Sequence, residues 1–190
     1  MRESIGRVAR PAMRYLLVSA ALAALAAPSA ASAQEVFAGF YAHGVDTPFS
    51  LSTGEGGADL ELGYRFAPIQ ALAAIGKPSP YVIGSLNTVG DTSFAGVGIS
   101  WKIGKGPLYV RPGAGLIVHD GPSFRVDRAS RTETDLGSRV LFEPELALGY
   151  RLTDKVALEA SWVHISGARL FNADQNPGID MWGARLNYRL

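Results

Sequence analysis

The 190-residue chain contains no cysteine and only three histidines. The absence of cysteine excludes disulfide bonds, so an exported chain must be held together by packing and hydrogen bonds alone. The histidines, His43, His119 and His164, are scattered and lack the ligand spacing of a zinc site, and we expect no cofactor. A formal net charge of +1 gives no indication of nucleic-acid binding.

An apolar run of transmembrane length is also absent. Residues 15–27, YLLVSAALAALAA, are shorter than the ~20 residues that a spanning helix needs. Arg14 precedes this run, and the small residues Ala31, Ser32 and Ala33 follow it. This order is typical of a secretory signal peptide, whereas a membrane anchor is the alternative. We expect residues 1–33 to be removed, which leaves 34–190 as one domain with 14 basic and 16 acidic side chains.

The remaining chain has no helical periodicity over a useful length. Apolar and polar residues alternate instead, in eight runs separated by turn residues, which predicts strands at roughly 35–43, 58–67, 80–88, 93–103, 107–119, 138–151, 155–166 and 179–190. Several runs have ten residues or more, which matches the ~9–11 residues of a strand crossing a bilayer. Strands of soluble proteins are usually shorter, about 5–6 residues.

The alternation separates an apolar face from a charged one. Between 138 and 152, Phe142, Leu146 and Leu148 occupy even positions, and Glu143 and Glu145 occupy odd positions. Aromatic residues lie near strand ends on the apolar face, as in the girdles of membrane barrels: Tyr64, Phe66, Trp101, Tyr150, Trp162, Trp182 and Tyr188. The charged face would then fill a narrow barrel, and we expect ion pairs there among Glu61, Arg65, Arg111, Glu143, Glu145, Arg151 and Arg185.

These features predict an all-β fold, an eight-stranded antiparallel transmembrane β-barrel in the bacterial outer membrane. The last residues continue the alternation, which resembles the terminal strand of such barrels. A soluble β-sandwich or lipocalin-like barrel remains the alternative. Short periplasmic turns fit 104–106 and 152–154, and long outer loops fit 44–57, 120–137 and 167–178. Two connections do not fit this arrangement. Residues 68–79 are long and rather apolar for a periplasmic turn, and a turn of helix there would account for their length. Residues 89–92 are short for an outer loop.

Three residues near the C-terminus carry the chemistry of a serine hydrolase. In an antiparallel hairpin, a register that pairs Trp162 with Trp182 also sets His164 opposite Asp180. Ser166 follows on the same, lipid-facing side. A serine needs a base to become nucleophilic, and an acid holds the histidine in the correct tautomer. The alternative is that these are ordinary polar residues at the rim of a barrel.

The stretch HISGARLFNADQNPGID, residues 164–180, resembles the signature of the lipid A 3-O-deacylase (PagL-like) family, His-x-Ser-Asn-Ala followed by Asn-Pro-Gly-x-Glu. The resemblance implies an outer-membrane esterase that acts on lipid A of lipopolysaccharide without a metal. His164 then serves as base, Ser166 as nucleophile and Asp180 as acid. It also implies that Asn176 and the backbone near Gly167 stabilise the oxyanion.

The chain departs from this signature at three points. Gly167 stands where the family has asparagine, Asp180 stands where it has glutamate, and the intervening loop is about two residues longer. These departures leave open a weakened activity, or a non-catalytic structural or adhesive barrel of the OmpX or opacity-like kind. The sequence also leaves open whether the protein forms a homodimer.

Overall fold

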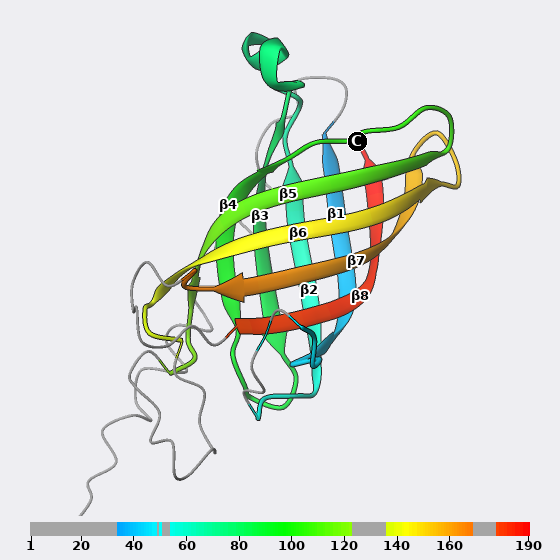
Figure 1. The fold of residues 1–190 in the computed structure, drawn as a ribbon. Coiled ribbons are helices and arrows are strands. Elements are labelled where there is room, and N and C mark those ends of the chain that lie inside the picture. Colours follow the sequence, from blue (N-terminus) through cyan, green and yellow to red (C-terminus); the bar gives the residue numbers. More distant parts are fainter. Residues whose placement is uncertain (1–33, 49, 51–53, 123–135, 169–177) are drawn as a thin grey trace, which may run out of the picture.

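Eight antiparallel strands close into a barrel in the computed structural model (Figure 1), which describes residues 34–48, 50, 54–122, 136–168 and 178–190. Each strand pairs with its neighbours in the chain, and β1 pairs with β8 to close the cylinder. The strands are β1 (Glu35–His43), β2 (Ala58–Arg65), β3 (Ser79–Asn87), β4 (Phe94–Ser100), β5 (Leu108–His119), β6 (Val140–Arg151), β7 (Val156–Ser166) and β8 (Gly178–Arg189).

All eight predicted strands are confirmed, and most of their ends agree within two residues. The largest difference is at β4, which was expected to run to 103 but ends at Ser100. Its partner strand carries Pro112, which accepts a hydrogen bond from the Trp101 amide at 2.9 Å but has no N–H to return. The ladder therefore breaks there, and only the isolated bridge between Ile103 and Val110 continues it.

The outer wall of the barrel is apolar. Large hydrophobic side chains at even positions of the strands are exposed, including Leu60, Leu116, Leu146, Leu148, Leu158, Trp182, Leu186 and Tyr188. So much contiguous apolar surface is unfavourable in water but fits the hydrocarbon of a bilayer. The expected transmembrane barrel is confirmed, and the alternative of a soluble sandwich or lipocalin-like barrel is wrong.

The inside of the barrel is filled by three buried arginines and their carboxylate partners. Arg185 donates to Glu61 at 2.7 Å and to Glu145 at 2.8 Å. The other two arginines share a carboxylate that was not predicted: Glu35 accepts from Arg65 at 3.0 Å and from Arg111 at 2.7 Å. Arg111 also donates to Glu159 at 2.8 Å, a second carboxylate missing from the predicted set.

Arg151 was expected in this interior cluster, and that expectation is wrong. It lies at the last position of β6, is exposed, and donates to the carbonyl oxygen of Gly106 at 2.8 Å. The alternating pattern continues to the end of the strand, but at Arg151 the strand has already reached the barrel end, so the side chain meets solvent.

The connections define the two ends of the barrel. Gln34, Leu190 and the turns after β2, β4 and β6 lie at one end, which is the periplasmic end in barrels of this type (Figure 1). The turn after β2 contains η1, a 3-10 helix at Gln70–Ile75, which confirms the turn of helix considered there. No helix among the described residues is long and apolar enough to cross a membrane.

The outer connection between β3 and β4 is short because one side chain organises it. The Asn87 side-chain oxygen accepts hydrogen bonds from three consecutive backbone amides, those of Val89, Gly90 and Asp91, each at 3.0 Å. This arrangement satisfies the turn's own donors, so the connection can be tight at the end where the other loops are long.

Candidate active site

The β7–β8 hairpin forms the predicted register. Trp162 lies opposite Trp182, His164 opposite Asp180, and Ser166 opposite Gly178. The residues between them, such as Val163 and Ile165, are buried in the barrel interior. Because side chains alternate along a strand, His164, Ser166 and Asp180 share the outer face with the exposed leucines of the same strands.

His164 and Asp180 form a hydrogen bond across the hairpin. Nδ1 of His164 lies 2.8 Å from Oδ1 of Asp180. The carboxylate is fully buried, and His164 is only 8% exposed. With Nδ1 engaged by the carboxylate, the ring presents Nε2 as its free basic position, which is the arrangement that a general base needs.

Gly178 makes room for the His164 ring. A Cβ atom built at position 178 would lie 2.4 Å from Cε1 and 3.0 Å from Nε2 of His164. The Cε1–Nε2 edge of the imidazole therefore lies over Gly178, the residue that pairs with Ser166. Glycine at this position allows the imidazole to lean from Asp180 toward Ser166.

Trp162 contacts both members of the His164–Asp180 pair. Its indole N–H donates to Oδ1 of Asp180 at 2.8 Å, the oxygen that also faces His164. Its ring stacks on the imidazole with centroids 5.9 Å apart and an angle of 25° between the planes. The sequence assigned Trp162 only to an aromatic girdle; its place two residues before His164 on the same face was the signal for this contact.

The segment after β1 covers the carboxylate. The Thr47 hydroxyl donates to Oδ2 of Asp180, and the backbone amide of Val45 donates to the Asp180 carbonyl oxygen at 2.9 Å. Both carboxylate oxygens of Asp180 therefore accept hydrogen bonds, which fix the orientation of the carboxylate beside His164. Sequence periodicity carries no signal for these loop contacts.

Ser166 is the last residue of β7 and is 5% exposed. It lies two residues beyond His164 on the same face, and among the described residues no hydrogen bond joins the two side chains. Gly167 follows directly, and Ala168 then turns the chain with a positive φ of 50°. Asn176 lies outside the described residues.

The other two histidines lie at strand ends near the outer rim. The His43 ring bridges Asp59 at 2.8 Å and Glu55 at 2.9 Å, and all three side chains are almost completely buried. His119 contacts the carbonyl oxygen of Ser138. Within the part of the chain that the structure describes, no group of three or more His, Asp or Glu residues is arranged to hold a metal ion.

Comparison with known structures identifies the same architecture elsewhere. The chain is similar to the outer-membrane enzyme PagL, with 14% identity and a TM-score of 0.58, over 82% of this chain and 99% of that one. It is also similar to Neisserial surface protein A, with 15% identity and a TM-score of 0.52, over 85% and 100% of the two chains. At such identities the likeness shows the fold alone.

A search of curated proteins finds no match. The family model for lipid A 3-O-deacylase (PagL), in contrast, matches residues 45–189, about three quarters of the chain and all of the β7–β8 hairpin. The chain therefore belongs to the lipid A 3-O-deacylase (PagL) family of ester hydrolases in the bacterial outer membrane.

Proposed function

We propose that this lipid A deacylase removes the ester-linked 3-hydroxyacyl chain at the 3-position of lipid A, using Ser166, His164 and Asp180. The observation that carries the proposal is the hydrogen bond between His164 and Asp180 at the end of a lipid-facing hairpin, with Ser166 on the same face. Family membership supports the substrate class, and the geometry supports the roles of the three residues.

In the first half of the reaction, the Ser166 hydroxyl oxygen attacks the ester carbonyl carbon while Nε2 of His164 takes its proton. Asp180 stabilises the imidazolium that forms. The tetrahedral intermediate then collapses, the carbon–oxygen bond to the sugar breaks, and His164 returns the proton to the departing sugar hydroxyl. The acyl chain remains on Ser166 as an ester.

In the second half, water attacks the acyl-enzyme carbonyl and gives a proton to His164. Collapse of this intermediate releases the 3-hydroxy fatty acid and returns the proton to Ser166. In both halves, negative charge develops on the carbonyl oxygen, which needs hydrogen-bond donors. We assign this role to the backbone N–H near Gly167 and to the Asn176 side chain.

The position of the site suits a substrate that resides in the membrane. Ser166 and His164 lie at the outer end of strands whose apolar side chains face lipid, with Trp162 and Trp182 beside them. Aromatic residues of this kind mark the boundary between hydrocarbon and headgroups. An ester at that depth in the outer leaflet would reach Ser166 without leaving the membrane.

The carboxylate contacts explain how aspartate can serve where the family signature has glutamate. Asp180 lies directly opposite His164, so the shorter side chain suffices to reach Nδ1. The hydrogen bonds from Trp162 and Thr47 hold it in that orientation.

The proposed reaction needs one chain. The similarity to PagL and to Neisserial surface protein A gives no support to a homodimer.

The test compares wild type with Ser166→Ala in a bacterial host that lacks a lipid A deacylase. Mass spectrometry of extracted lipid A is expected to show the loss of one 3-hydroxyacyl chain with wild type alone. Heat-modifiable migration in gels confirms that both proteins fold in the outer membrane. Identical lipid A spectra from the two folded proteins would contradict the proposal and favour a non-catalytic barrel.

A further inference from the structure

The β2–β3 connection extends past the barrel end as an ordered hairpin. The ladder continues beyond Arg65, since the Phe66 amide donates to Pro80 at 2.8 Å and the Ile69 amide donates to Pro78 at 2.9 Å. The 3-10 helix η1 follows and ends at Gly76, which has a φ of 90°. Figure 1 shows η1 standing out from the barrel at the end where the C-terminus lies.

The hairpin tip is apolar but buries nothing. The sequence of η1 is QALAAI, and none of its residues is buried. Leu72 is 38% exposed and Ile75 57%. Leu72 lies at a kink within η1, where its φ of −97° and ψ of 31° are not helical, and Ile75 is the last residue of η1. The catalytic proposal does not use this surface.

The tip is continuous with the lipid-facing wall of the barrel. The indole N–H of Trp101 donates to the Ile75 carbonyl oxygen at 2.8 Å, and the ring lies against Gly76. Ile103, beyond Trp101 on the next turn, is 57% exposed. Tryptophan favours the membrane–water interface because its ring is apolar and its N–H is polar. Its bond to Ile75 therefore places η1 near that interface.

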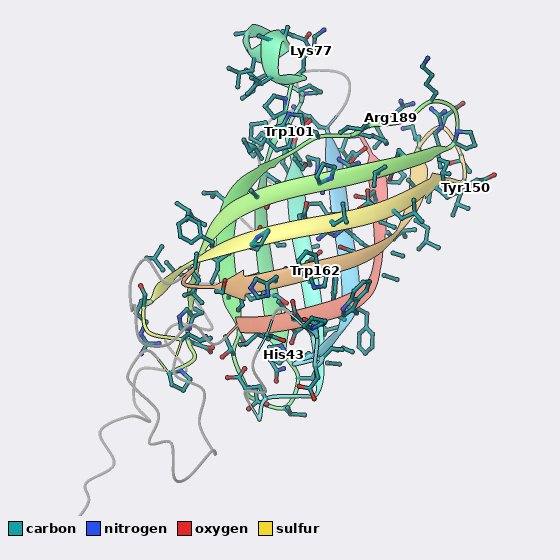
Figure 2. The ribbon with its side chains drawn as sticks, viewed as in Figure 1. His43, Lys77, Trp101, Tyr150, Trp162 and Arg189 are labelled. Atoms are coloured by element: carbon teal, nitrogen blue, oxygen red, sulfur yellow. The ribbon has the colours of Figure 1, made fainter. Side chains whose placement is uncertain are left out.

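Exposed positive charge is spread over the same end of the barrel. Figure 2 shows Lys77 and Arg189 at this end and His43 at the opposite one. The exposed basic residues of the described periplasmic turns and strand ends are Lys77, Lys102, Lys105, Arg151, Lys155 and Arg189. Lys102 forms an ion pair with Glu35 at 3.4 Å, and in the described parts of these segments the exposed acidic residue is Asp154. Such an excess of cations attracts anionic phospholipid headgroups.

We propose that residues 66–78 form an interfacial anchor in the periplasmic leaflet of the outer membrane. Leu72 and Ile75 enter the boundary between headgroups and acyl chains, and Lys77 binds the phosphate of an anionic phospholipid. Apolar side chains combined with nearby cations are the two contributions that hold interfacial helices on membranes. The anchor fixes the depth of the barrel from the end opposite the active site and does not depend on the catalytic proposal.

The absence of native cysteine makes a spin-label test direct. Single cysteines replace Leu72 or Ile75, each carries a nitroxide, and the barrel is refolded into vesicles of phosphatidylethanolamine and phosphatidylglycerol. Leu148→Cys on the lipid-facing wall and Asp154→Cys in a periplasmic turn are the lipid and water references. Gln70→Cys is the matched control within η1. Relaxation by dissolved oxygen and by a water-soluble nickel chelate measures the surroundings of each label.

We expect the labels at 72 and 75 to be relaxed by oxygen more than by nickel, between the two references, and the label at 70 to resemble that at 154. Replacing phosphatidylglycerol by phosphatidylcholine, or Lys77 by asparagine, is expected to raise nickel access at 75. Asparagine tolerates the positive φ of 55° found at Lys77.

Nickel access at 72 and 75 equal to that at 154 in both lipid mixtures would overturn the proposal, because the hairpin would then stand in water. Protection from both oxygen and nickel would also overturn it, since a protein would then cover the tip. Heat-modifiable migration of each variant confirms that the barrel has folded. Deacylation of lipid A by the same variants is measured separately, because it tests the catalytic proposal and not the anchor.

Discussion

The indole nitrogen of Trp162 and Nδ1 of His164 lie at the same distance, 2.8 Å, from one carboxylate oxygen of Asp180. Two donors on one oxygen, with Thr47 on the other, leave the short aspartate side chain little freedom. The His164 imidazole is thereby held by its hydrogen bond to Asp180 and by the indole ring stacked on it. In the proposed mechanism, Trp162 is therefore a positioning residue that acts through Asp180 and His164.

Trp162→Phe keeps an aromatic ring but removes the N–H. Because a hydrogen bond to a charged group contributes about 1.5–3 kcal/mol, we expect kcat for lipid A deacylation to fall roughly 10-fold or more. KM should change little, since the substrate does not bind the indole N–H. Trp182→Phe, which alters the neighbouring indole, is the control. Equal effects of the two variants on kcat would show that the N–H contact is unimportant.

Asp180→Asn removes the charge and retains the size of the side chain. The amide can present its N–H₂ to Nδ1, which favours the wrong histidine tautomer, so we expect kcat to fall by about 10³-fold or more, by analogy with serine hydrolases. Asp46→Asn, in the segment that covers the site, should retain nearly full activity. Kinetics on purified lipid A in detergent measures both. Substantial activity in folded Asp180→Asn would exclude Asp180 as the orienting acid.

Gly178→Ala adds a methyl group where the His164 ring lies. The new Cβ would approach Cε1 to 2.4 Å, so the ring must shift. A displacement near 1 Å can lower the rate about 100-fold, and we expect a decrease of roughly 10- to 100-fold in kcat. Gly56→Ala, where nothing lies within 4 Å of the added atom, is the matched control. Unchanged kcat in Gly178→Ala would contradict the assigned position of the base.

Arg185→Met leaves Glu61 and Glu145 without their main partner inside the barrel. Breaking a buried ion pair from one side costs about 3–5 kcal/mol, and we expect a decrease of this size in the free energy of unfolding. Urea unfolding in lipid vesicles, followed by tryptophan fluorescence, is the measurement. Arg151→Met, at an exposed position, should change stability by less than about 1 kcal/mol. Similar losses in both variants would contradict the interior network.

Stability at the outer rim should depend on the charge of Glu55. Burial alone raises the pKa of Glu55, but hydrogen bonds from His43 and Thr92 outweigh it and hold the pKa below its usual value. A depressed pKa in the folded state means that ionised Glu55 stabilises the fold above the unfolded pKa of about 4.3. This contribution disappears as the pH falls through the lower, folded pKa.

The stability difference between wild type and Glu55→Gln should therefore be largest near neutral pH and shrink below about pH 4. Unfolding free energies measured across this range test the prediction. Asp91→Asn, nearby in the β3–β4 connection, serves as a comparison. A difference in unfolding free energy that stays constant with pH would show that the charge of Glu55 does not contribute to stability.

The alternation of apolar and polar residues was sufficient to predict the strands, the closed barrel and the pairing of His164 with Asp180. A two-residue period assigns each side chain to a face, and a directly opposed pair then follows from the register. The same rule failed at Arg151, because alternation does not mark where the barrel ends. It also missed Glu35, the first residue of β1, although its carboxylate joins Arg65 and Arg111.

The alternation rule could not predict contacts made by the segments that connect the strands. The hydrogen bond from Thr47 to Asp180 joins residues 133 positions apart, and loop residues carry no periodic signal. The predicted roles of Asn176 and Gly167 depend on the connection after β7, whose residues likewise carry no periodic signal. The shortness of β4, by contrast, could have been anticipated from Pro112 in the neighbouring strand, since proline lacks an N–H.

The packed lumen has a consequence for the cell. Arg65, Arg111 and Arg185, with their carboxylates, occupy the cross-section through which nutrients and antibiotics would otherwise pass. A bacterium can therefore hold many copies in its envelope without making that envelope leakier. The barrel is a filled cylinder, and the surface that it offers to other molecules is its outer wall.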